Sequence, residues 1–436
     1  MREKSINDLA KELELLKLEN RRLSELIATP TVTSRETSQE TTPDLDLPLS
    51  LDEYKRYGRQ MIVPQLRLNG QLKLKSAKIL VVGAGGLGCP ALYYLCGAGV
   101  GTIGIVDHDT VDISNLHRQI LHSNKTVGML KCDSAQKKLN ELNPLVIIIT
   151  HPVAIANDNV FEIMKDYDLV LDCTDTPATR YLVNDAAVIL GKTIVSGSGV
   201  KTEGQLSILN FSQTGPCYRC FYPSPPPPNS VTACSDGGVI GPIIGLVGTM
   251  MAIEAIKVVT GSYTVESFQP FLSLYSGYPQ QSLRTFKMRG KSPKCAVCST
   301  NATLTRDMVE SGAIDYSAFC GKVDYNVVDQ RTERITVSEY TSLETKGCLL
   351  DVRPKEQFEI CSLPGSVSIP LAQLQRCHSE DLKGLYEPLY IVCRYGNDSQ
   401  LAARELRNKF GFEKVKDLIG GLNAWSQEID DTFPRY

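Results

Sequence analysis

Two pairs of cysteines share a spacing that suits a metal ion. Cys217 and Cys220 form one C-x-x-C sequence, and Cys295 and Cys298 form a second in "KCAVCS". Each pair can bind a metal from one turn, and four thiolates complete a tetrahedral Zn²⁺ site that has no open position. We therefore predict a structural zinc site that joins distant segments. A redox C-x-x-C sequence and incidental buried cysteines are the alternatives.

Two further cysteines stand where a thiol can react. Cys234 follows the run "PSPPPP" in a glycine-rich stretch typical of a mobile loop, where an exposed thiol can serve as a nucleophile. The alternative is an ordinary loop cysteine. Cys393 comes directly after the apolar run "LYIV", just before a helix expected to begin near Ser399. This position predicts a sulfur atom over backbone N–H groups and a helix N-terminus, which would stabilise a persulfide anion, with Arg394 adding positive charge.

A glycine-rich turn indicates a nucleotide site. "VVGAGGLGCPAL" places Gly83, Gly85, Gly86 and Gly88 between an apolar run and a helical pattern. Glycines let backbone N–H groups approach phosphate oxygens, and the helix N-terminus favours their negative charge. Asp107 ends the next apolar run, where an acid can hold ribose hydroxyls. Taken alone, this pattern favours a nicotinamide or flavin oxidoreductase.

The residues that follow fit hydride transfer poorly. Lys131 lies on a helical pattern, and Asp175 ends another apolar run, with Thr176 beside it. The cations Arg118 and Lys131, with an amide side chain from the run "SNLHRQ", lie near a phosphate-binding turn and suit a triphosphate during displacement. A carboxylate such as Asp175 can hold Mg²⁺. Surface charges or helix caps are the alternative for each residue alone. The candidate binding set also includes the run "SNLHRQ", which is Ser114, Asn115, Leu116, His117, Arg118 and Gln119; His117 is assigned no role of its own.

These groups require an α/β scaffold. From residue 76 onward, apolar runs such as "AKILVVGAG", "GTIGIVDHD" and "DLVLDCTD" alternate with helical patterns, which predicts a mainly parallel sheet. A second, smaller alternation begins near residue 330 with "CLLDVRP". We expect a short N-terminal helix (1–28), a flexible linker (29–50), a first α/β domain (51–310), a linker (311–329) and a second α/β domain (330–436). Apolar spacing in residues 6–27, with Asn20 at a register-setting position, favours a coiled coil and a solvated helix about equally.

Composition limits the setting of the protein. The net charge of −3 over 436 residues gives no sign of direct nucleic-acid binding. The charged N-terminus lacks the pattern of a signal peptide, so we expect a cytoplasmic protein whose 14 cysteines serve metal binding and catalysis more than disulfides. The uncharged stretch "GGVIGPIIGLVGTMMAI" is shorter than the roughly 20 residues of a spanning helix. We interpret it as a loop leading into a buried helix, with no membrane association.

Five motifs together resemble the MoeB/ThiF family of ubiquitin-activating-type adenylyltransferases. They are "RYGRQM", "GAGGLGCP", "VDHDTVDISNLHRQ", the Lys131 region and "DCTD", and the resemblance covers about residues 51–310. It implies a Rossmann-like domain in which ATP converts the C-terminal glycine of a ubiquitin-like protein to an acyl-adenylate. It also implies that Arg59 reaches the active site of the partner subunit of a homodimer, and that Cys234 is a thioester-forming or resolving cysteine. The ATP or Mg²⁺ contacts it implies are Gly86, Asp107, Asn115, Arg118, Lys131 and Asp175. Many members of the family also carry the two C-x-x-C pairs.

The C-terminal part resembles rhodanese domains over about residues 330–436. "LLDVRP", "LYIVCRYGND" and "LIGGLNAW" carry the resemblance, which implies a persulfide at Cys393 and a structural role for Asp351 and Arg353. A C-x5-R phosphatase loop is the competing interpretation. Ser399 occupies the position of that arginine, which favours sulfur transfer.

The pairing of the two domains resembles the eukaryotic activators of a ubiquitin-related modifier. The implied reaction uses ATP, Mg²⁺ and Zn²⁺, and it ends in a C-terminal thiocarboxylate on a modifier with a Gly-Gly tail. That product would serve tRNA wobble-uridine thiolation, protein conjugation and molybdopterin synthesis, with sulfur supplied by a cysteine desulfurase or another sulfurtransferase. An NAD-dependent oxidoreductase with an accessory domain and a non-catalytic scaffold are the alternatives.

Overall fold

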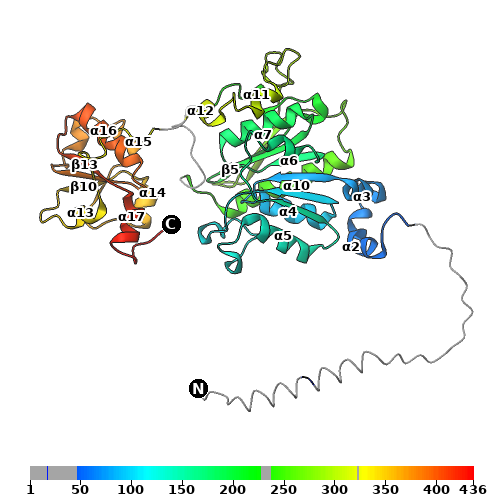
Figure 1. Cartoon of the computed structure of the whole chain (residues 1–436), viewed down its shortest axis with the longest axis horizontal. Coiled ribbons are helices and arrows are strands. Elements are labelled where there is room, and N and C mark those ends of the chain that lie inside the picture. The colour runs from blue at the N-terminus through cyan, green and yellow to red at the C-terminus, as the bar shows by residue number, and fades with distance from the viewer. Residues whose placement is uncertain (1–16, 18–46, 227–236, 322–323) are drawn as a thin grey trace, which may run out of the picture. The chain divides into compact units, whose positions relative to one another are not determined.

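The computed structural model of the protein describes residues 17, 47–226, 237–321 and 324–436 (Figure 1). The predicted N-terminal helix and coiled coil, most of the predicted linker over residues 29–50, and Cys234 lie outside these residues. The larger part of the described chain is an α/β domain around an eight-stranded sheet, and the smaller C-terminal part is an α/β domain around a five-stranded sheet.

The larger sheet is parallel in its first five strands and antiparallel in its last three. Its spatial order is β3-β2-β1-β4-β5-β6-β7-β8. The parallel strands are β1 (Lys78–Val82), β2 (Thr102–Val106), β3 (Ile147–His151), β4 (Leu169–Asp172) and β5 (Thr193–Val200). The antiparallel strands are β6 (Glu203–Leu209), β7 (Phe271–Ser276) and β8 (Ser282–Lys287). The prediction of a mainly parallel sheet is confirmed.

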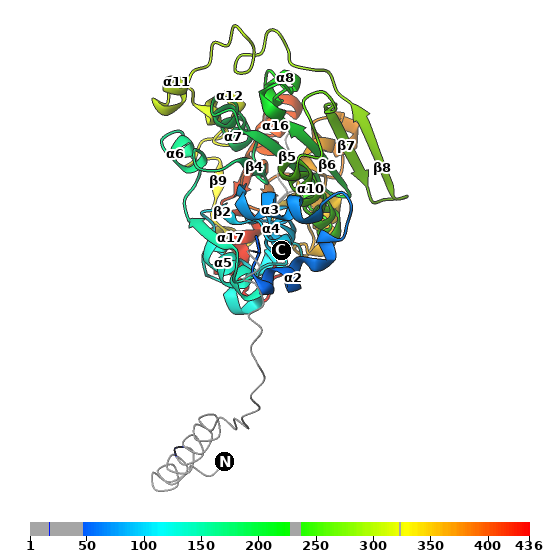
Figure 2. The ribbon, with the colours of Figure 1, turned by 90° about the vertical axis from the view of Figure 1, so that its right-hand side faces the viewer.

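Helices cover both faces of this sheet, which explains why its central strands are continuous apolar runs. In β1, Ile79 and Val81 join one hydrophobic core while Leu80 and Val82 join the other. The first core is covered by α3 (Arg67–Ser76), α4 (Gly88–Ala98), α5 (Lys131–Leu142) and α10 (Gly241–Thr260), with α2 (Leu51–Met61) packed on α3. The second is covered by α6 (Val160–Met164), α7 (Pro177–Ile189), α8 (Tyr218–Phe221), α11 (Arg306–Glu310) and α12 (Tyr316–Cys320) (Figure 2). Short 3₁₀ turns are η1 (Ile113–Asn115), η2 (Asn124–Thr126) and η3 (Phe211–Gln213).

Helix α10 agrees with the interpretation of this stretch as a loop leading into a buried helix. The helix begins at Gly241, and Pro242 stands in its first turn, where a proline is tolerated. Gly248 allows close packing on α4, since a Cβ atom there would lie 2.2 Å from the Leu87 carbonyl oxygen. Within the described chain, α10 is the one helix long and apolar enough to span a membrane. It packs on α3, α4, β5 and β6, and Val247 and Met251 lie in the first core, so we assign it to the domain interior.

Helices α11 and α12 belong to the packing of the larger domain, although the predicted boundary falls at residue 310. Val309 and Tyr316 are buried in the second core, and the Tyr316 hydroxyl donates a 2.9 Å hydrogen bond to Asp185 on α7. The Asn157 amide donates to the carbonyls of Val309 and Ile314. These contacts fix residues 306–320 to the face of the sheet that α7 covers.

The smaller domain has an entirely parallel sheet in the order β11-β10-β12-β13-β9. Its strands are β9 (Arg334–Ile335), β10 (Cys348–Asp351), β11 (Val367–Ser368), β12 (Leu389–Val392) and β13 (Val415–Leu418). Its helices are α13 (Val337–Thr341), α14 (Lys355–Ile360), α15 (Leu371–Leu374), η5 (Ser379–Leu382), α16 (Asp398–Phe410) and α17 (Gly421–Glu428). Leu350 and Ile391 face one core while Leu349 and Tyr390 face the other, so this sheet too is buried on both faces.

Candidate functional site

A cavity of about 870 Å³ lies at the carboxyl ends of the parallel strands in the larger domain. Strand β1 is flanked by β2 and β4, so the chain reverses its direction across the sheet at this point. Open α/β sheets bind ligands in the crevice outside such a switch point. The sequence-predicted residues that line the cavity are Gly83, Gly85, Gly86, Asp107, Arg118, Gln119, Lys131, Asp175 and Thr176.

The glycine turn is held by close backbone contacts. Gly83 has φ +99°, a conformation that residues with a Cβ atom rarely adopt. A Cβ atom on Gly88 would lie 1.9 Å from the Gly83 carbonyl oxygen, so α4 can begin this close to the turn only at a glycine. Asp107 fixes the turn from the next strand, since its carboxylate accepts hydrogen bonds from the N–H groups of Ala84 (2.8 Å) and Asp109 (2.9 Å). Gly88 therefore shapes the site without lining the cavity.

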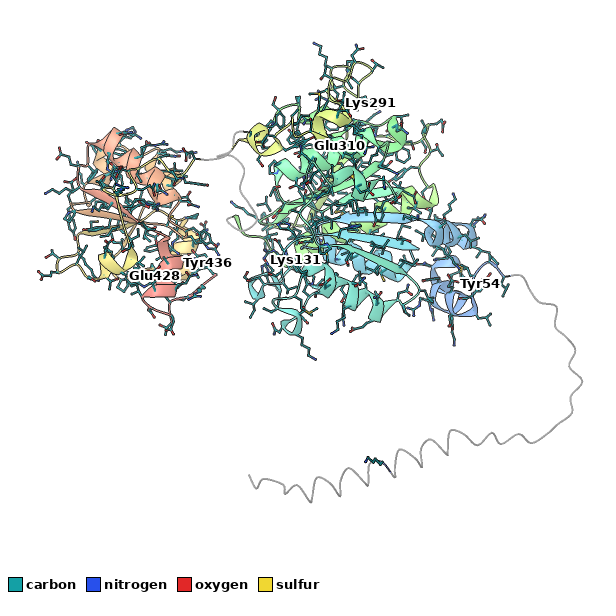
Figure 3. The ribbon with its side chains drawn as sticks, in the orientation of Figure 1. Tyr54, Lys131, Lys291, Glu310, Glu428 and Tyr436 are labelled. Atoms are coloured by element: carbon teal, nitrogen blue, oxygen red, sulfur yellow. The ribbon has the colours of Figure 1, made fainter. Side chains whose placement is uncertain are left out.

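Lys131 is the first residue of α5, and only 5 % of it is exposed. Its Nζ donates a 2.7 Å hydrogen bond to Asp109 Oδ2. Burial raises the pKa of the Asp109 carboxyl, but the hydrogen bond and charge of Lys131 outweigh it, so that this pKa is lowered overall. Figure 3 labels Lys131 in the larger domain. Asp109 is a cavity residue that the sequence analysis missed, although it lies two positions after Asp107.

Arg118 is held in place by its own segment. Its guanidinium donates to Asn115 Oδ1 (2.5 Å) and the Ser114 carbonyl (3.3 Å), and lies 2.7 Å from His117 Nε2. Ser114, Asn115, Leu116 and His117 do not appear among the cavity-lining residues. Ser114, Asn115 and His117 therefore position the Arg118 guanidinium, which does line the cavity.

Gln119 carries the one buried side-chain acceptor in the described chain that lacks a hydrogen-bond partner. Its Oε1 atom is unpaired although only 5 % of the residue is exposed. The side chain lies over the glycine turn, since a Cβ atom on Gly85 would be 3.6 Å from Gln119 Nε2. Leaving such an acceptor unpaired costs roughly 1–3 kcal/mol, so a hydrogen-bond donor within reach of this side chain would be favoured. Ribose hydroxyls and the adenine amine of ATP are such donors.

The carboxylate side of the cavity follows β4. Asp175 is exposed and lines the cavity, while the Thr176 hydroxyl caps α7 by accepting from the Thr179 N–H. Arg180 lies beneath them and donates to the carbonyls of Thr174 and Gly197. Arg180 was missed by the sequence analysis because it falls inside a regular helical pattern and no motif marks it.

The cavity continues from the glycine turn to the antiparallel strands. Its far part is lined by Ser198, Glu203, Gln205, Leu274, Tyr275 and Arg284 from β5, β6, β7 and β8. These strands come from segments separated by α10, so local sequence patterns gave no signal that they meet.

The four paired cysteines meet in the larger domain. Cys217 Sγ lies 3.9 Å from Cys220 Sγ and 3.5 Å from Cys295 Sγ, and Cys220 Sγ lies 3.3 Å from Cys298 Sγ. The sulfurs of a tetrahedral zinc site with Zn–S bonds of about 2.3 Å are roughly 3.8 Å apart. Hydrogen bonds among the thiols lower the pKa of Cys220, to about 6, and that of Cys295, while they raise the pKa of Cys217 and Cys298. The cluster is therefore compatible with a metal ion.

Cys393 comes directly after β12 in the smaller domain, and only 2 % of it is exposed. The backbone N–H of Gly396 donates to Sγ at 3.2 Å, and the N–H groups of Tyr395 and Ser399 also favour its anion. Burial nevertheless raises the pKa of this thiol, and the charge of Asp398 adds to the effect. The cysteine thus lies in the expected backbone cradle, with its thiol form favoured at rest.

The remaining candidates are Arg59, Cys234 and the pair of Asp351 and Arg353. Arg59 lies exposed on α2 and does not line the cavity of its own chain. Cys234 is outside the described residues. Asp351, the last residue of β10, forms a buried ion pair at 2.6 Å with Arg353.

The glycine turn, the cations around it and the switch-point cavity are typical of a nucleotide-binding enzyme domain, joined here to a second α/β domain with a cysteine in a backbone cradle. Residues 57–297 match the ThiF family and residues 336–428 match the rhodanese-like domain. The chain belongs to the ThiF family and carries a C-terminal rhodanese-like domain.

Curated relatives match the chain along most or all of its length. The chain is 62 % identical over 392 residues to adenylyltransferase and sulfurtransferase uba4 of Ogataea parapolymorpha, covering 89 % of this chain and 100 % of that protein. It is 55 % identical to the corresponding UBA4 of Scheffersomyces stipitis, covering 98 % of each chain. It is 54 % identical to UBA4 of Saccharomyces cerevisiae, covering 100 % of each chain. The protein is an adenylyltransferase and sulfurtransferase, and an adenylyltransferase of this kind uses ATP and Mg²⁺.

Proposed function

We propose that the protein adenylates the C-terminal glycine of a ubiquitin-like modifier and then converts it to a thiocarboxylate with sulfur carried on Cys393. The observation that carries the proposal is the continuous cavity from the glycine turn to strands β7 and β8. Its nucleotide end has phosphate-binding features, and its other end has space and polar groups for an extended Gly-Gly tail.

In the first reaction the modifier's carboxylate attacks the α-phosphate of ATP. The new bond is between carboxylate oxygen and phosphorus, and pyrophosphate leaves. The glycine turn, Arg118 and Lys131 would neutralise the phosphates, Asp107 would hold the ribose, and Gln119 would accept a hydrogen bond from the nucleoside. Asp175 would hold Mg²⁺, which bridges phosphate oxygens when bound. The protein supplies positioning and charge neutralisation, and no protein nucleophile is needed.

In the second reaction a persulfide on Cys393 displaces AMP. Its terminal sulfur attacks the acyl carbon, so that the modifier is joined to Cys393 through an acyl disulfide. A second thiol then attacks the Cys393 sulfur, a protein disulfide forms, and the thiocarboxylate leaves. Cys234 is our candidate for this resolving thiol, and a thioester formed at Cys234 before the persulfide acts is the other order of events.

We assign Zn²⁺ to the cysteine cluster as a structural ion. The four sulfurs join α8 to the segment before α11, and the Ser292 N–H donates a 3.3 Å hydrogen bond to Cys220 Sγ. Such N–H···S bonds stabilise thiolates around a metal. The site would fix the base of the segment that carries Cys234.

The thiocarboxylate would serve tRNA wobble-uridine thiolation and protein conjugation, with molybdopterin synthesis as a further use. The partners proposed are a modifier with a Gly-Gly tail, a persulfide donor such as a cysteine desulfurase, and a second copy of this chain. We propose a cytoplasmic location. An NAD-dependent oxidoreductase is disfavoured because Arg118 and Lys131 both line the nucleotide cavity, where a dinucleotide needs no second phosphate-binding cation.

The test is isotope exchange between pyrophosphate and ATP with a Gly-Gly-tailed ubiquitin-like protein. Exchange that depends on the modifier is the expected result. Absence of exchange together with bound nicotinamide would support the oxidoreductase, and absence of both exchange and nucleotide binding would support a scaffold. In the sulfur half-reaction, the Cys393→Ser variant is expected to adenylate the modifier but form no thiocarboxylate.

A further inference from the structure

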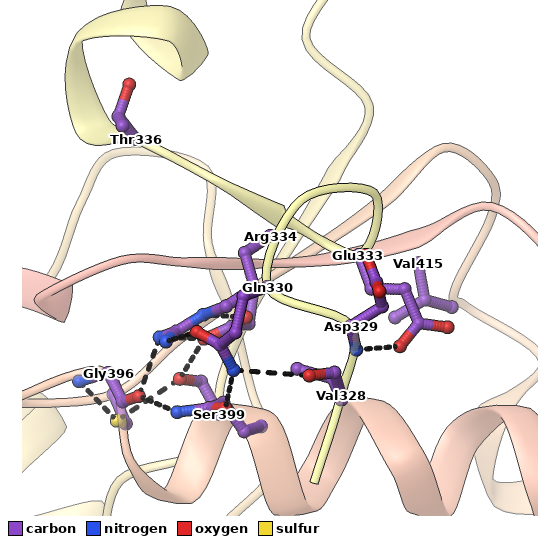
Figure 4. A network of polar contacts seen from close by, with 12 residues as sticks. Val328, Asp329, Gln330, Glu333, Arg334, Thr336, Gly396, Ser399 and Val415 are labelled. Carbon is purple, nitrogen blue, oxygen red and sulfur yellow. Dashed lines mark hydrogen bonds and ion pairs between the residues drawn. The ribbon is translucent and has the colours of Figure 1, made fainter. Parts of the chain in front are cut away.

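A network of polar contacts includes Ser399 and Gly396 (Figure 4), and both residues contact the sulfur of Cys393. Cys393 Sγ lies 3.5 Å from Ser399 Oγ, and the Ser399 hydroxyl donates a 2.9 Å hydrogen bond to Asp417 Oδ2. Ser399 and Asp417 are completely buried, and Cys393 nearly so. Ser399 comes from the first turn of α16 and Asp417 from β13, so two different elements complete the arrangement.

We propose that Ser399 and Asp417 form a relay that takes the thiol proton from Cys393 when sulfur is loaded. The inference rests on the proposed persulfide at Cys393. Ser399 touches the reacting sulfur and is the catalytic member. Asp417 acts through Ser399 and is the positioning residue.

The direction of the hydrogen bonds supports the relay. Because the Ser399 hydroxyl gives its only proton to Asp417, its free lone pair faces Cys393 and can accept the S–H proton. A shift of both protons along the relay leaves a thiolate that faces two donors, the Ser399 hydroxyl and the Gly396 N–H. Without an acceptor the buried thiol would be a poor nucleophile, since thiolate and not thiol attacks sulfur.

The charged groups around the relay act in opposite senses. Asp398, at the start of α16, disfavours the Cys393 thiolate, and Arg394 lies in the loop between them. Arg334 from β9 donates to both oxygens of Asp417 (2.9 and 3.0 Å) and to the Gly396 carbonyl (2.9 Å). Arg407 on α16 also faces Asp417 and pairs with Glu333. Burial raises the pKa of Asp417 in spite of both arginines, so this carboxylate retains affinity for a proton.

The loading step balances without an added oxidant or reductant. The Cys393 S–H bond breaks, its proton moves to Ser399 oxygen, and the Ser399 proton moves to Asp417. The thiolate forms a bond to the outer sulfur of the donor, and the donor's S–S bond breaks with its electron pair on the leaving group. With thiosulfate as the donor the leaving group is sulfite. The relay then runs in reverse: Asp417 returns a proton to Ser399, and the Ser399 proton passes to the departing sulfite, which carries it to solvent.

The test uses the full chain and thiosulfate as the sulfur donor, with cyanide as acceptor. In such a double-displacement reaction, kcat/KM for thiosulfate reports the loading step alone, and its pH dependence reports groups of the free enzyme. Ser399→Ala keeps the Asp417–Arg334 pair and is expected to lower this parameter about 100-fold at pH 7. It should also move the acid limb of the profile to higher pH. Ser399→Thr restores the hydroxyl and is expected to recover most of the rate. Ser426→Ala, which removes another buried hydroxyl from this domain, is the matched control.

Three outcomes would contradict either the relay or the proposed persulfide at Cys393. A Ser399→Ala profile that matches that of the unaltered chain, with only a lower Tm, would show that the hydroxyl is structural. If Ser399→Ala does not fold, the relay is tested on the unaltered chain by the solvent deuterium isotope effect on kcat/KM for thiosulfate. A slower reaction in D₂O supports the relay, and an unchanged or faster one contradicts it. Sulfur transfer by Cys393→Ser would instead overturn the proposed persulfide itself.

Discussion

Lys131 and Asp109 are joined twice at the cavity of the larger domain. The backbone N–H of Lys131 donates to the Asp109 carbonyl at 2.9 Å, and Lys131 Nζ donates to Asp109 Oδ2 at 2.7 Å. The lysine is almost fully buried while 53 % of the Asp109 side chain is exposed. A phosphate that enters the cavity therefore meets an ammonium group already held in position, which lowers the entropy cost of binding.

We predict that Lys131→Met abolishes most adenylation with little loss of stability. Removing a charge that stabilises the transferred phosphate costs about 100-fold or more in rate, and Asp109 is exposed enough to be hydrated when its partner is gone. The measurement is modifier-dependent pyrophosphate exchange. Lys138→Met on the same helix, where Lys138 forms an exposed pair with Glu141, is the control that should keep full activity. An active Lys131→Met enzyme would remove this residue from the proposed site.

For the cysteine cluster we predict one zinc ion per chain by elemental analysis. Cys295→Ser is expected to lose the metal and to lower the Tm of the larger domain by about 10 °C, because a structural ion contributes its binding energy to folding. Cys320→Ser changes a cysteine outside the cluster and should do neither. Metal-free protein with an unchanged Tm would refute the structural role.

Much of the fold was predictable because its signals are local. The β1 run and the glycines after it specify a buried parallel strand, a tight turn and a helix start within a dozen or so residues. Those same signals placed Asp107, Lys131 and Asp175 correctly around one cavity. The carboxyl ends of parallel strands share one edge of a sheet, so that residues far apart in sequence converge there without any long-range information.

The missed residues depend on tertiary contacts that leave no local pattern. Arg284 reaches the cavity only because β8 pairs with β7 at the far edge of the sheet. Asp417 lies inside the run "VKDL", where a buried acid looks like an interruption of a strand, and its partner Arg334 comes from the start of the domain. Neither partner can be found until the strand order is known.

His122 gives the larger domain a predicted pH dependence. Its Nδ1 lies 2.9 Å from Ser134 Oγ and its Nε2 lies 3.1 Å from the carbonyl oxygen of Ala84 in the glycine turn. Burial lowers the pKa of His122, partly opposed by the hydrogen bond to Ala84. Below about pH 6.5 the unfolded chain therefore binds a proton that the folded chain resists, and stability falls as the pH decreases, by up to about 1.4 kcal/mol per pH unit.

The measurement is chemical unfolding of the larger domain between pH 7.5 and about 5.5, a window that spans the ordinary histidine pKa. His122→Gln is expected to be less stable at neutral pH and to lose the acid-side slope, because an amide does not titrate. His378→Gln, at an exposed histidine of the smaller domain, should leave the slope unchanged. An unaltered slope in His122→Gln would assign the effect to other groups.

The Asp351–Arg353 pair is predicted to stabilise the smaller domain without acting in catalysis. Arg353 donates to both oxygens of Asp351, and 1 % and 0 % of the two side chains are exposed. Asp351→Asn leaves a buried guanidinium without its counter-charge and should cost about 3–5 kcal/mol. Calorimetry is expected to show early unfolding of the smaller domain, while modifier-dependent pyrophosphate exchange persists. If Asp351→Asn lowers both the stability of the smaller domain and the pyrophosphate exchange, the effect of the pair is not confined to the smaller domain.

Arg59 tests the proposed homodimer, because it is exposed on α2 and does not line the cavity of its own chain. If it completes the partner's site, Arg59→Ala and Lys131→Met should each be inactive alone and active when co-expressed. Half of the dimers are then mixed, and each mixed dimer holds one site with both residues intact, so about a quarter of the unaltered activity should return. Arg56→Ala, at another exposed arginine of α2, should be active alone. If the mixed dimers are inactive, Arg59 does not complete the partner's site. Each site of a mixed dimer would then depend on one chain alone, and each chain carries one of the two substitutions.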